Sequence, residues 1–227
     1  MKPRILIGAL SGWQYQDRRD RCRSTWMNDG DDRDIQSLFL LGCPTAKEPE
    51  QMGLHTLALP CQDDYRHLPH KTRLFAQWAL QRKDWDYLFK CDDDTYISMP
   101  RFLDYDPAGR DYIGAEWRPG AGYGSGGAGY FLSRLAAGYV AEFGGSYSLD
   151  SYPPGAEDMI VGALLRANGV EFSIEPRLIP FATLDLRPKK NNDLITSHAC
   201  TEAFMASHEE TGNEAVRCSW SRSDRRW

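Results

Sequence analysis

The chain has 227 residues, of which 41% are hydrophobic and 26% are charged, as expected for a globular domain large enough to bury a core. Its formal net charge of −5 argues against a nucleic-acid-binding domain, because such domains usually present a basic surface. The sequence contains no run of roughly 18 apolar residues, which excludes an ordinary transmembrane helix within it.

The first part of the chain predicts strands that alternate with helices. Residues 5–10 form an apolar run that ends at Ser11-Gly12, which predicts a buried parallel strand. An arginine-rich helix is expected at 17–27, a second strand at 35–41 and a short third strand at 57–59.

A longer helix is expected at 63–83, because its apolar residues recur at steps of three and four. The apolar run at 87–91 predicts a strand that leads directly into Asp92-Asp93-Asp94. Further elements are expected in this order: a strand at 111–115, a glycine-rich loop at 120–129, a strand or helix start at 130–133, a helix at 135–143, a helix at 156–168 stopped by Gly169, and a strand at 170–174.

This alternation predicts an α/β sheet covered by helices on both faces. We assign residues 1–218 to one domain and the polar, basic residues 219–227 to a solvent-exposed tail. The cysteines form no CxxC pair, which argues against a zinc site. Without an export signal we expect free thiols, and disulfides remain the alternative. The six cysteines are Cys22, Cys43, Cys61, Cys91, Cys200 and Cys218.

The acidic triplet Asp92-Asp93-Asp94 is the most informative feature of the sequence. Three adjacent carboxylates repel one another, and a divalent cation such as Mn²⁺ or Mg²⁺, which prefers carboxylate oxygens, would relieve that repulsion. Open α/β sheets bind ligands at the carboxyl ends of their strands, where the triplet falls. Because residues i and i+2 of an extended chain point to the same side, Asp92 and Asp94 can share a ligand while Asp93 faces elsewhere. The pattern predicts a cation site that serves a pyrophosphate.

Two other interpretations of the triplet are weaker. A solvated acidic turn seldom follows a buried strand. A haloacid-dehalogenase-type phosphatase requires DxDx[TV], and here Tyr96 occupies the final position of that motif.

Five segments, in chain order, carry signatures of one known family. They are RRDRCRSTW at 18–26, DDYRHLPHKT at 63–72 with Trp78 beyond it, LFKCDDD at 88–94, YGSGGAGYFLS at 123–133 and EDMIVG at 157–162. Together they resemble the RRxxxRxTW, DxYxNLxxKT, KxDDD, YxSGxGYxLS and EDVxxG motifs of the β-1,3-galactosyltransferase and Fringe-like inverting glycosyltransferases. The chain departs from these motifs at His67, where Asn is usual, and by one added residue in the glycine run.

The resemblance implies a GT-A fold, which is a single α/β domain with a mixed, mostly parallel sheet flanked by helices. It also implies that Asp94 and His198 ligate Mn²⁺ or Mg²⁺. Asp92 would support the metal or the ribose, and Asp93 is grouped with it among the donor-binding residues. His208 is the competing candidate for the metal-binding histidine.

Asp158 matches the catalytic base of the family. It falls in the first turn of the helix expected at 156–168, where the helix dipole favours an ionised carboxylate. Val161 and Leu165 share its face and would anchor that face to the core. A capping carboxylate is the structural alternative, and neighbouring Glu157 is expected to order the loop.

Four cationic side chains are candidates to contact uracil or diphosphate, with solvated or ion-paired surface positions as the alternative. They are Arg18, Arg19, Arg23 and Lys71, of which Arg19 and Lys71 are favoured. The pair Gly126-Gly127 would let the backbone approach the donor sugar, and a flexible surface loop is the alternative.

The resemblance implies a metal-dependent enzyme that moves a hexose or N-acetylhexosamine from a UDP-sugar to a glycan or glycolipid hydroxyl, with a β-1,3 linkage. A sugar-nucleotide-binding module without turnover and a nucleotidyltransferase remain open as alternatives. Eukaryotic members of the family are typically Golgi proteins with a membrane anchor and a stem, which this sequence does not show. We therefore expect a cytoplasmic enzyme of bacterial or viral type, with peripheral contact at the inner membrane face through the tail as an alternative.

Overall fold

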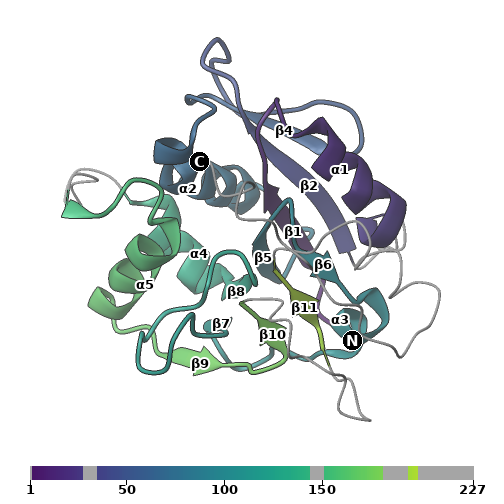
Figure 1. The fold of residues 1–227 in the computed structure, drawn as a ribbon. Helices are drawn as coiled ribbons and strands as arrows, with labels where there is room; N and C mark the ends of the chain where they lie inside the picture. Colours follow the sequence, from purple (N-terminus) through teal and green to yellow (C-terminus); the bar gives the residue numbers. More distant parts are fainter. Residues whose placement is uncertain (1, 28–34, 144–150, 181–193, 199–227) are drawn as a thin grey trace, which may run out of the picture.

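The computed structural model of the chain describes residues 2–27, 35–143, 151–180 and 194–198. Within these ranges an eight-stranded sheet with the order β3-β4-β2-β1-β5-β8-β7-β9 forms the centre of the molecule (Figure 1), and a three-stranded sheet has the order β10-β11-β6. The strands are β1 (Ile5–Leu10), β2 (Ile35–Gly42), β3 (Glu50–Gln51), β4 (Thr56–Leu59), β5 (Tyr87–Asp92), β6 (Tyr96–Ile97), β7 (Tyr112–Gly114), β8 (Tyr130–Ser133), β9 (Phe172–Ile174), β10 (Leu178–Ile179) and β11 (Thr196–Ser197).

The α-helices are α1 (Gln16–Cys22), α2 (Leu68–Leu80), α3 (Met99–Asp104), α4 (Arg134–Ala141) and α5 (Glu157–Ala167). A π-helix, η1 (Arg23–Met27), continues α1, and a 3₁₀-helix, η3 (Tyr65–His67), precedes α2. None of the helices in the described ranges is both long enough and apolar enough to cross a bilayer.

The large sheet is mixed and mostly parallel, as predicted. Its parallel pairs are β1–β2, β1–β5, β2–β4 and β7–β9, and its antiparallel pairs are β3–β4, β5–β8 and β7–β8. In the pairing of β1 with β5, Leu10 lies beside Asp92. The carboxyl ends of two central strands therefore meet where the acidic triplet begins.

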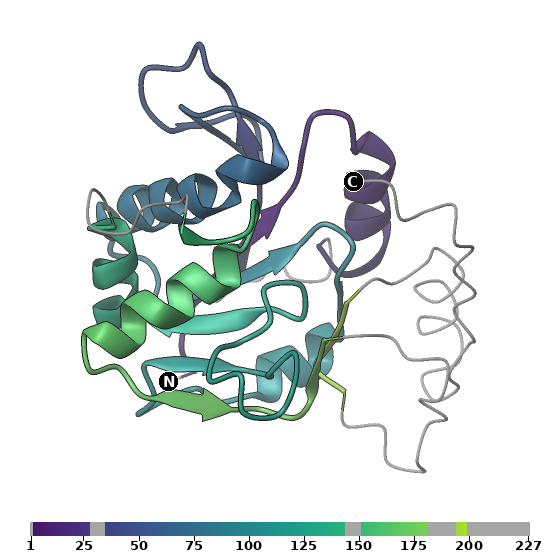
Figure 2. The ribbon, with the colours of Figure 1, turned by 60° about the vertical axis from the view of Figure 1, so that its left-hand side comes forward.

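Helices cover both faces of this sheet. Because side chains alternate along a strand, each strand contributes residues to the core on either face. Leu6 and Leu10 of β1 belong to a core that includes residues of α2, α4 and α5. Ile5, Ile7 and Ala9 belong to a second core formed with residues of α1, η1 and α3. Figure 2 shows α1 on the side of the sheet opposite to α2, α4 and α5.

The first predicted helix, 17–27, is divided in the structure, since α1 ends at Cys22 and a π-helix follows. The hydroxyls of Ser24 and Thr25 donate to the Arg21 carbonyl at 3.0 and 2.7 Å, and such side-chain bonds compete with regular helix geometry. The indole N–H of Trp26 donates to the Thr95 carbonyl at 2.9 Å, which ties the π-helix to the chain after the triplet.

The second predicted helix, 63–83, is shorter than expected, because a capped 3₁₀-helix precedes α2 and the α-helix begins only at Leu68. The Asp64 carboxylate accepts the His67 backbone N–H at 3.1 Å and ends the extended segment before η3. Pro69 then occupies the first turn of α2, a position that tolerates proline.

Helix α3 and the strands β3, β6, β10 and β11 were not predicted. Each strand of this set has two residues, too few for a periodic pattern. Of the cysteines, Cys22, Cys43, Cys61 and Cys91 are free thiols, and Cys200 and Cys218 lie outside the described residues, as do His208 and the predicted tail 219–227.

Candidate functional site

The acidic triplet lies at the carboxyl end of β5, near the middle of the large sheet. Asp93 and Asp94 lie in a turn that the Thr95 N–H closes by donating to the Asp92 carbonyl at 3.2 Å, and the chain then forms β6. Strand β11 pairs with β6 in antiparallel fashion, with Ser197 opposite Tyr96. This short pairing brings His198, from far along the sequence, to the triplet.

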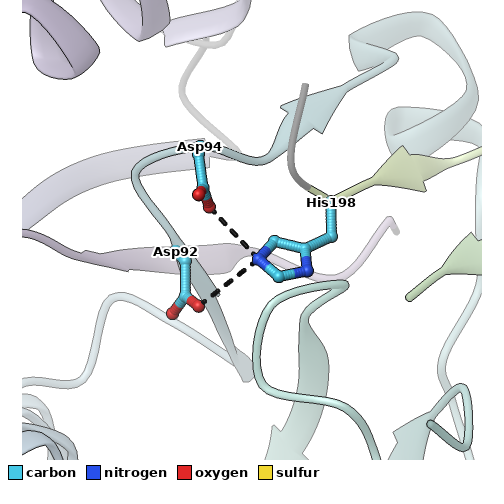
Figure 3. Close-up of side chains that lie close together, drawn as sticks. All are labelled: Asp92, Asp94 and His198. Carbon is cyan, nitrogen blue, oxygen red and sulfur yellow. Dashed lines mark ion pairs between the residues drawn. The ribbon is translucent and has the colours of Figure 1, made fainter. Parts of the chain in front are cut away.

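Asp92, Asp94 and His198 form a compact group (Figure 3). The His198 Nε2 atom lies 3.2 Å from Asp94 Oδ1 and 3.8 Å from Asp92 Oδ2. One ligand atom from each residue falls within 4.8 Å of the others. His198 Nδ1 lies 2.9 Å from the Pro180 carbonyl oxygen, which can only accept a hydrogen bond, so Nδ1 is the donor and Nε2 points at the carboxylates.

The chemistry of this group fits a divalent cation. Two carboxylates and an imidazole are ligands that Mn²⁺ accepts, and the buried Asp94 Oδ1 lies beside the His198 Nε2 atom at 3.2 Å. Burial lowers the pKa of His198, but Asp94 and Asp92 outweigh that effect and raise it to about 9. The surrounding carboxylates therefore favour positive charge here, whether an imidazolium or a metal ion carries it.

Asp93 is not part of this group, but the extended chain expected for the triplet is absent, because β5 ends at Asp92 and Asp93 and Asp94 lie in a turn. Its carboxylate accepts the Ser11 hydroxyl at 2.7 Å and the Arg18 Nη1 at 3.2 Å. Burial, together with the charge of Asp94, raises the pKa of Asp93 to about 7. The same Arg18 Nη1 lies 3.4 Å from Asp94 Oδ2, so one guanidinium bridges two members of the triplet.

A pocket of about 350 Å³ opens beside the triplet, and the triplet, His198, Arg18 and Lys71 line it. The Lys71 ammonium is buried and donates to the Ser11 carbonyl at 2.7 Å and to Asp63 Oδ1 at 2.6 Å. Two exposed aromatic side chains, Tyr65 and Trp117, also line this pocket. The pocket thus combines cationic, anionic and aromatic groups.

Arg19 has a different place from Arg18, although the two are adjacent. Its buried guanidinium donates to the Ser11 hydroxyl, to the Gly12 carbonyl and to the Trp13 carbonyl. These bonds hold the loop between β1 and α1. Within the described chain, the residues that line the pocket include Arg18 and do not include Arg19.

The two glycines of the predicted donor-binding loop lie directly against the site. A Cβ atom on Gly127 would fall 2.4 to 2.5 Å from three atoms of the His198 ring. A Cβ atom on Gly126 would fall 2.8 Å from Lys90 Nζ. A side chain at position 127 would therefore displace the His198 ring, and one at position 126 would have to move the end of the Lys90 side chain.

Lys90 and Glu157 form a buried ion pair behind the triplet that we did not predict as part of the site. Lys90 Nζ lies 3.0 Å from Asp92 Oδ1, 3.2 Å from the Gly126 carbonyl and 3.1 Å from Glu157 Oε2. Burial disfavours the lysine's charge, but the charges of Asp92 and Glu157 outweigh it, and its pKa is raised. A lysine inside the apolar strand 87–91 was the available signal in the sequence.

Glu157 accepts two further hydrogen bonds. The Thr72 hydroxyl donates to it at 2.8 Å, and the Tyr130 hydroxyl also donates. Burial raises the pKa of Glu157, although Lys90 opposes this. Glu157 thus joins α2, β8 and the start of α5, which extends the loop-ordering role expected for it.

Asp158 lies in the first turn of α5, as predicted. Its Oδ2 accepts the Gly126 N–H at 3.2 Å and its Oδ1 accepts the Met159 N–H at 2.8 Å. Among the described residues, those that line the 350 Å³ pocket do not include Asp158. It is connected to the triplet through Gly126, whose carbonyl accepts from Lys90.

The fold is that of the GT-A glycosyltransferases, which confirms the predicted fold class. The crystal structure of a glycosyltransferase involved in the glycosylation of the major capsid of PBCV-1 matches with a TM-score of 0.56 at 12% identity, covering 92% of this chain and 99% of that chain. The mannosyltransferase PcManGT from Pyrobaculum calidifontis, solved with GDP-Man and Mn²⁺, matches with a TM-score of 0.52 at 13% identity, covering 83% of this chain and 59% of that chain. At these identities the likeness concerns the fold.

The family model described as Galactosyltransferase matches residues 17–106. Human Beta-1,3-galactosyltransferase 4 is 28% identical over 116 residues, or 44% of this chain and 31% of that protein. Hydroxyproline O-galactosyltransferase GALT2 of Arabidopsis thaliana is 28% identical over 110 residues, or 44% of this chain and 16% of that protein. The matched part thus spans less than a third of each of these relatives.

These matches confirm the predicted resemblance to the β-1,3-galactosyltransferases. The part matched by the family model contains the first three motifs, including the acidic triplet. Asp158 and His198 lie beyond it.

Proposed function

We propose that this protein is a metal-dependent inverting glycosyltransferase. It moves a hexose or an N-acetylhexosamine from a UDP-sugar to a hydroxyl of a glycan or glycolipid acceptor and forms a β-1,3 linkage. The observation that carries the proposal is the group of Asp92, Asp94 and His198, which lines a pocket at the carboxyl end of β5. The GT-A fold and the galactosyltransferase likeness of residues 17–106 support it.

The pocket offers what a nucleoside diphosphate needs. Asp92, Asp94 and His198 would hold Mn²⁺ or Mg²⁺, which neutralises negative charge on a leaving diphosphate. Lys71 and Arg18 add positive charge on the same wall, and Tyr65 and Trp117 offer aromatic faces to a base or a sugar ring. Asp93, held by Ser11 and Arg18, keeps the wall in place.

The proposed reaction is a single in-line displacement at the anomeric carbon of the donor. The acceptor oxygen attacks this carbon as its proton passes to the Asp158 carboxylate, and the bond from the carbon to the diphosphate oxygen breaks. The anomeric centre inverts, so an α-linked donor gives a β-linked product. The backbone N–H groups of Gly126 and Met159 orient the Asp158 carboxylate.

An assay that measures UDP release tests the proposal. The protein is incubated with Mn²⁺ and each of a panel of UDP-sugars, and UDP release reports both donor hydrolysis and sugar transfer. Asp158→Asn is expected to lower transfer by about 10²- to 10⁴-fold while UDP binding stays within about twofold. Asp94→Ala is expected to abolish metal-dependent UDP binding in calorimetry. Asp104→Asn, which changes an exposed carboxylate that is not among the described residues lining the pocket, is the matched control.

Each contrary result has a defined meaning. Normal turnover by Asp158→Asn contradicts its role as the base. Release of pyrophosphate when the protein is given UTP and a sugar 1-phosphate, together with no release of UDP from any UDP-sugar, assigns the protein to the nucleotidyltransferases. Binding of UDP without release from any UDP-sugar, with acceptors present, assigns a sugar-nucleotide-binding module.

A further inference from the structure

Arg18 is a cation that the protein itself places against the triplet. Its Nη1 lies 3.2 Å from Asp93 Oδ1 and 3.4 Å from Asp94 Oδ2. It extends from α1, whereas the carboxylates follow β5. The Arg18 side chain is 20% exposed and lines the pocket, so the contact is made on the pocket wall.

Positive charge already surrounds the candidate cation ligands. Arg18 contacts Asp94, and Lys90 Nζ lies 3.0 Å from Asp92 Oδ1. A divalent cation that arrived alone would bring two further positive charges to the same two carboxylates. Because like charges at this separation repel strongly in a partly buried site, the protein's own cations oppose the binding of free metal.

The two cations differ in their freedom to move. Lys90 is buried and is held by the Gly126 carbonyl and by Glu157 as well as by Asp92. Arg18 is partly exposed, and its guanidinium carbon lies 4.5 Å from the centre of the Tyr15 ring, which also lines the pocket. A rotation of the Arg18 side chain would therefore move its guanidinium from the carboxylates to a ligand in the same pocket. A planar guanidinium is suited to binding a phosphate.

We propose that Arg18 is a donor-binding residue that leaves Asp94 for the diphosphate, and that this exchange couples the binding of the metal to the binding of the nucleotide. The inference rests on the proposed function. It follows that the cation binds weakly by itself and tightly together with a nucleoside diphosphate. By linkage, the cation strengthens nucleotide binding by the same factor.

Calorimetry of Mn²⁺ binding, with and without saturating UDP and corrected for the Mn²⁺–UDP complex in solution, measures the coupling. For the wild-type protein we expect UDP to strengthen Mn²⁺ binding by about 100-fold. Arg18→Gln is expected to tighten Mn²⁺ binding without UDP by about tenfold and to reduce the coupling to about tenfold or less. Arg21→Gln, which removes an exposed charge paired with Asp17 on the same helix, is expected to leave both values unchanged.

A second variant separates this role from a purely structural one. Arg18→Gln leaves the buried Asp93 without its counter-charge, so it lowers stability. Arg18→Gln combined with Asp93→Asn removes both charges, restores the thermal midpoint and keeps Mn²⁺ binding without UDP near the wild-type value. We expect its coupling to stay as low as that of the single variant.

Two results are decisive against the proposal. If wild-type protein binds Mn²⁺ and UDP, but both variants keep the wild-type coupling, Arg18 is only a structural partner of Asp93. If the wild-type protein binds neither ligand, the proposed function itself is refuted, and the role of Arg18 with it.

Discussion

Lys90→Met tests the buried charges that connect the triplet to α5. The Lys90 ammonium has three hydrogens to donate, and Asp92, Gly126 and Glu157 provide an acceptor each at 3.0 to 3.2 Å. Methionine fills a similar volume without charge. The substitution therefore leaves Glu157 buried, with hydroxyl donors from Thr72 and Tyr130 but no counter-ion.

The expected loss of stability is large. Removing one partner of a buried ion pair costs about 3–5 kcal/mol, because the remaining charge is left uncompensated. In a domain of this size each kcal/mol lowers the thermal midpoint by roughly 2–4 °C, so the midpoint of Lys90→Met should fall by about 10 °C. Lys90→Met combined with Glu157→Gln should recover at least half of the loss, since the buried side chain at position 157 then carries no charge, and Asp92, which also loses Lys90, is partly exposed.

Urea unfolding followed by tryptophan fluorescence, with a thermal scan by circular dichroism, measures these differences. Lys83→Met, an exposed lysine in the turn before β5, is the matched control and should stay within about 0.5 kcal/mol of wild type. Equal stability of Lys90→Met and Lys83→Met would refute the reasoning, because it would mean that the buried Lys90 charge makes no net contribution to the free energy of unfolding.

Two further predictions concern His198. Asp94 and Asp92 raise the pKa of His198 from 6.5 to about 9 against the effect of burial. Protonation of His198 therefore stabilises the metal-free fold by up to about 3 kcal/mol below pH 6.5, and this stabilisation is lost as the pH rises through about 9. Urea unfolding across that window should show the decline, and His198→Gln should remove it; a wild-type profile that is flat or rising there contradicts the assignment. Gly127→Ala should weaken Mn²⁺ binding at least about tenfold, because its Cβ would meet the His198 ring, whereas Gly138→Ala, with open space in α4, should leave it unchanged. Equal Mn²⁺ affinities in these two variants would show that Gly127 does not hold the ring in place.

The main strands could be predicted from the sequence because each is a local apolar run. The strands expected at 5–10, 35–41 and 87–91 agree with β1, β2 and β5 to within one residue at either end. The same local pattern placed the triplet at a strand end, and the order of strands and helices gave the fold class. Helix α1 ended earlier than predicted because side-chain hydroxyls and the Trp26–Thr95 bond act there.

The sequence analysis favoured Arg19 over Arg18, whereas among the described residues Arg18 lines the pocket and Arg19 does not. Successive residues on a helix point about 100° apart, so one of the two faces the triplet and the other faces the loop between β1 and α1. Which residue takes which place depends on how α1 packs against the sheet. The motif contains both arginines and does not indicate which of them faces the triplet.

The sequence by itself determined the sheet, its covering helices and a carboxylate triplet at a central strand end, because these depend on the order of neighbouring residues. Only the tertiary structure decided how distant residues meet. His198 reaches Asp94 through the two-residue strand β11, and Lys90 meets Glu157 across the sheet and α5. Such contacts arise from packing between elements far apart in the chain, which no local pattern records.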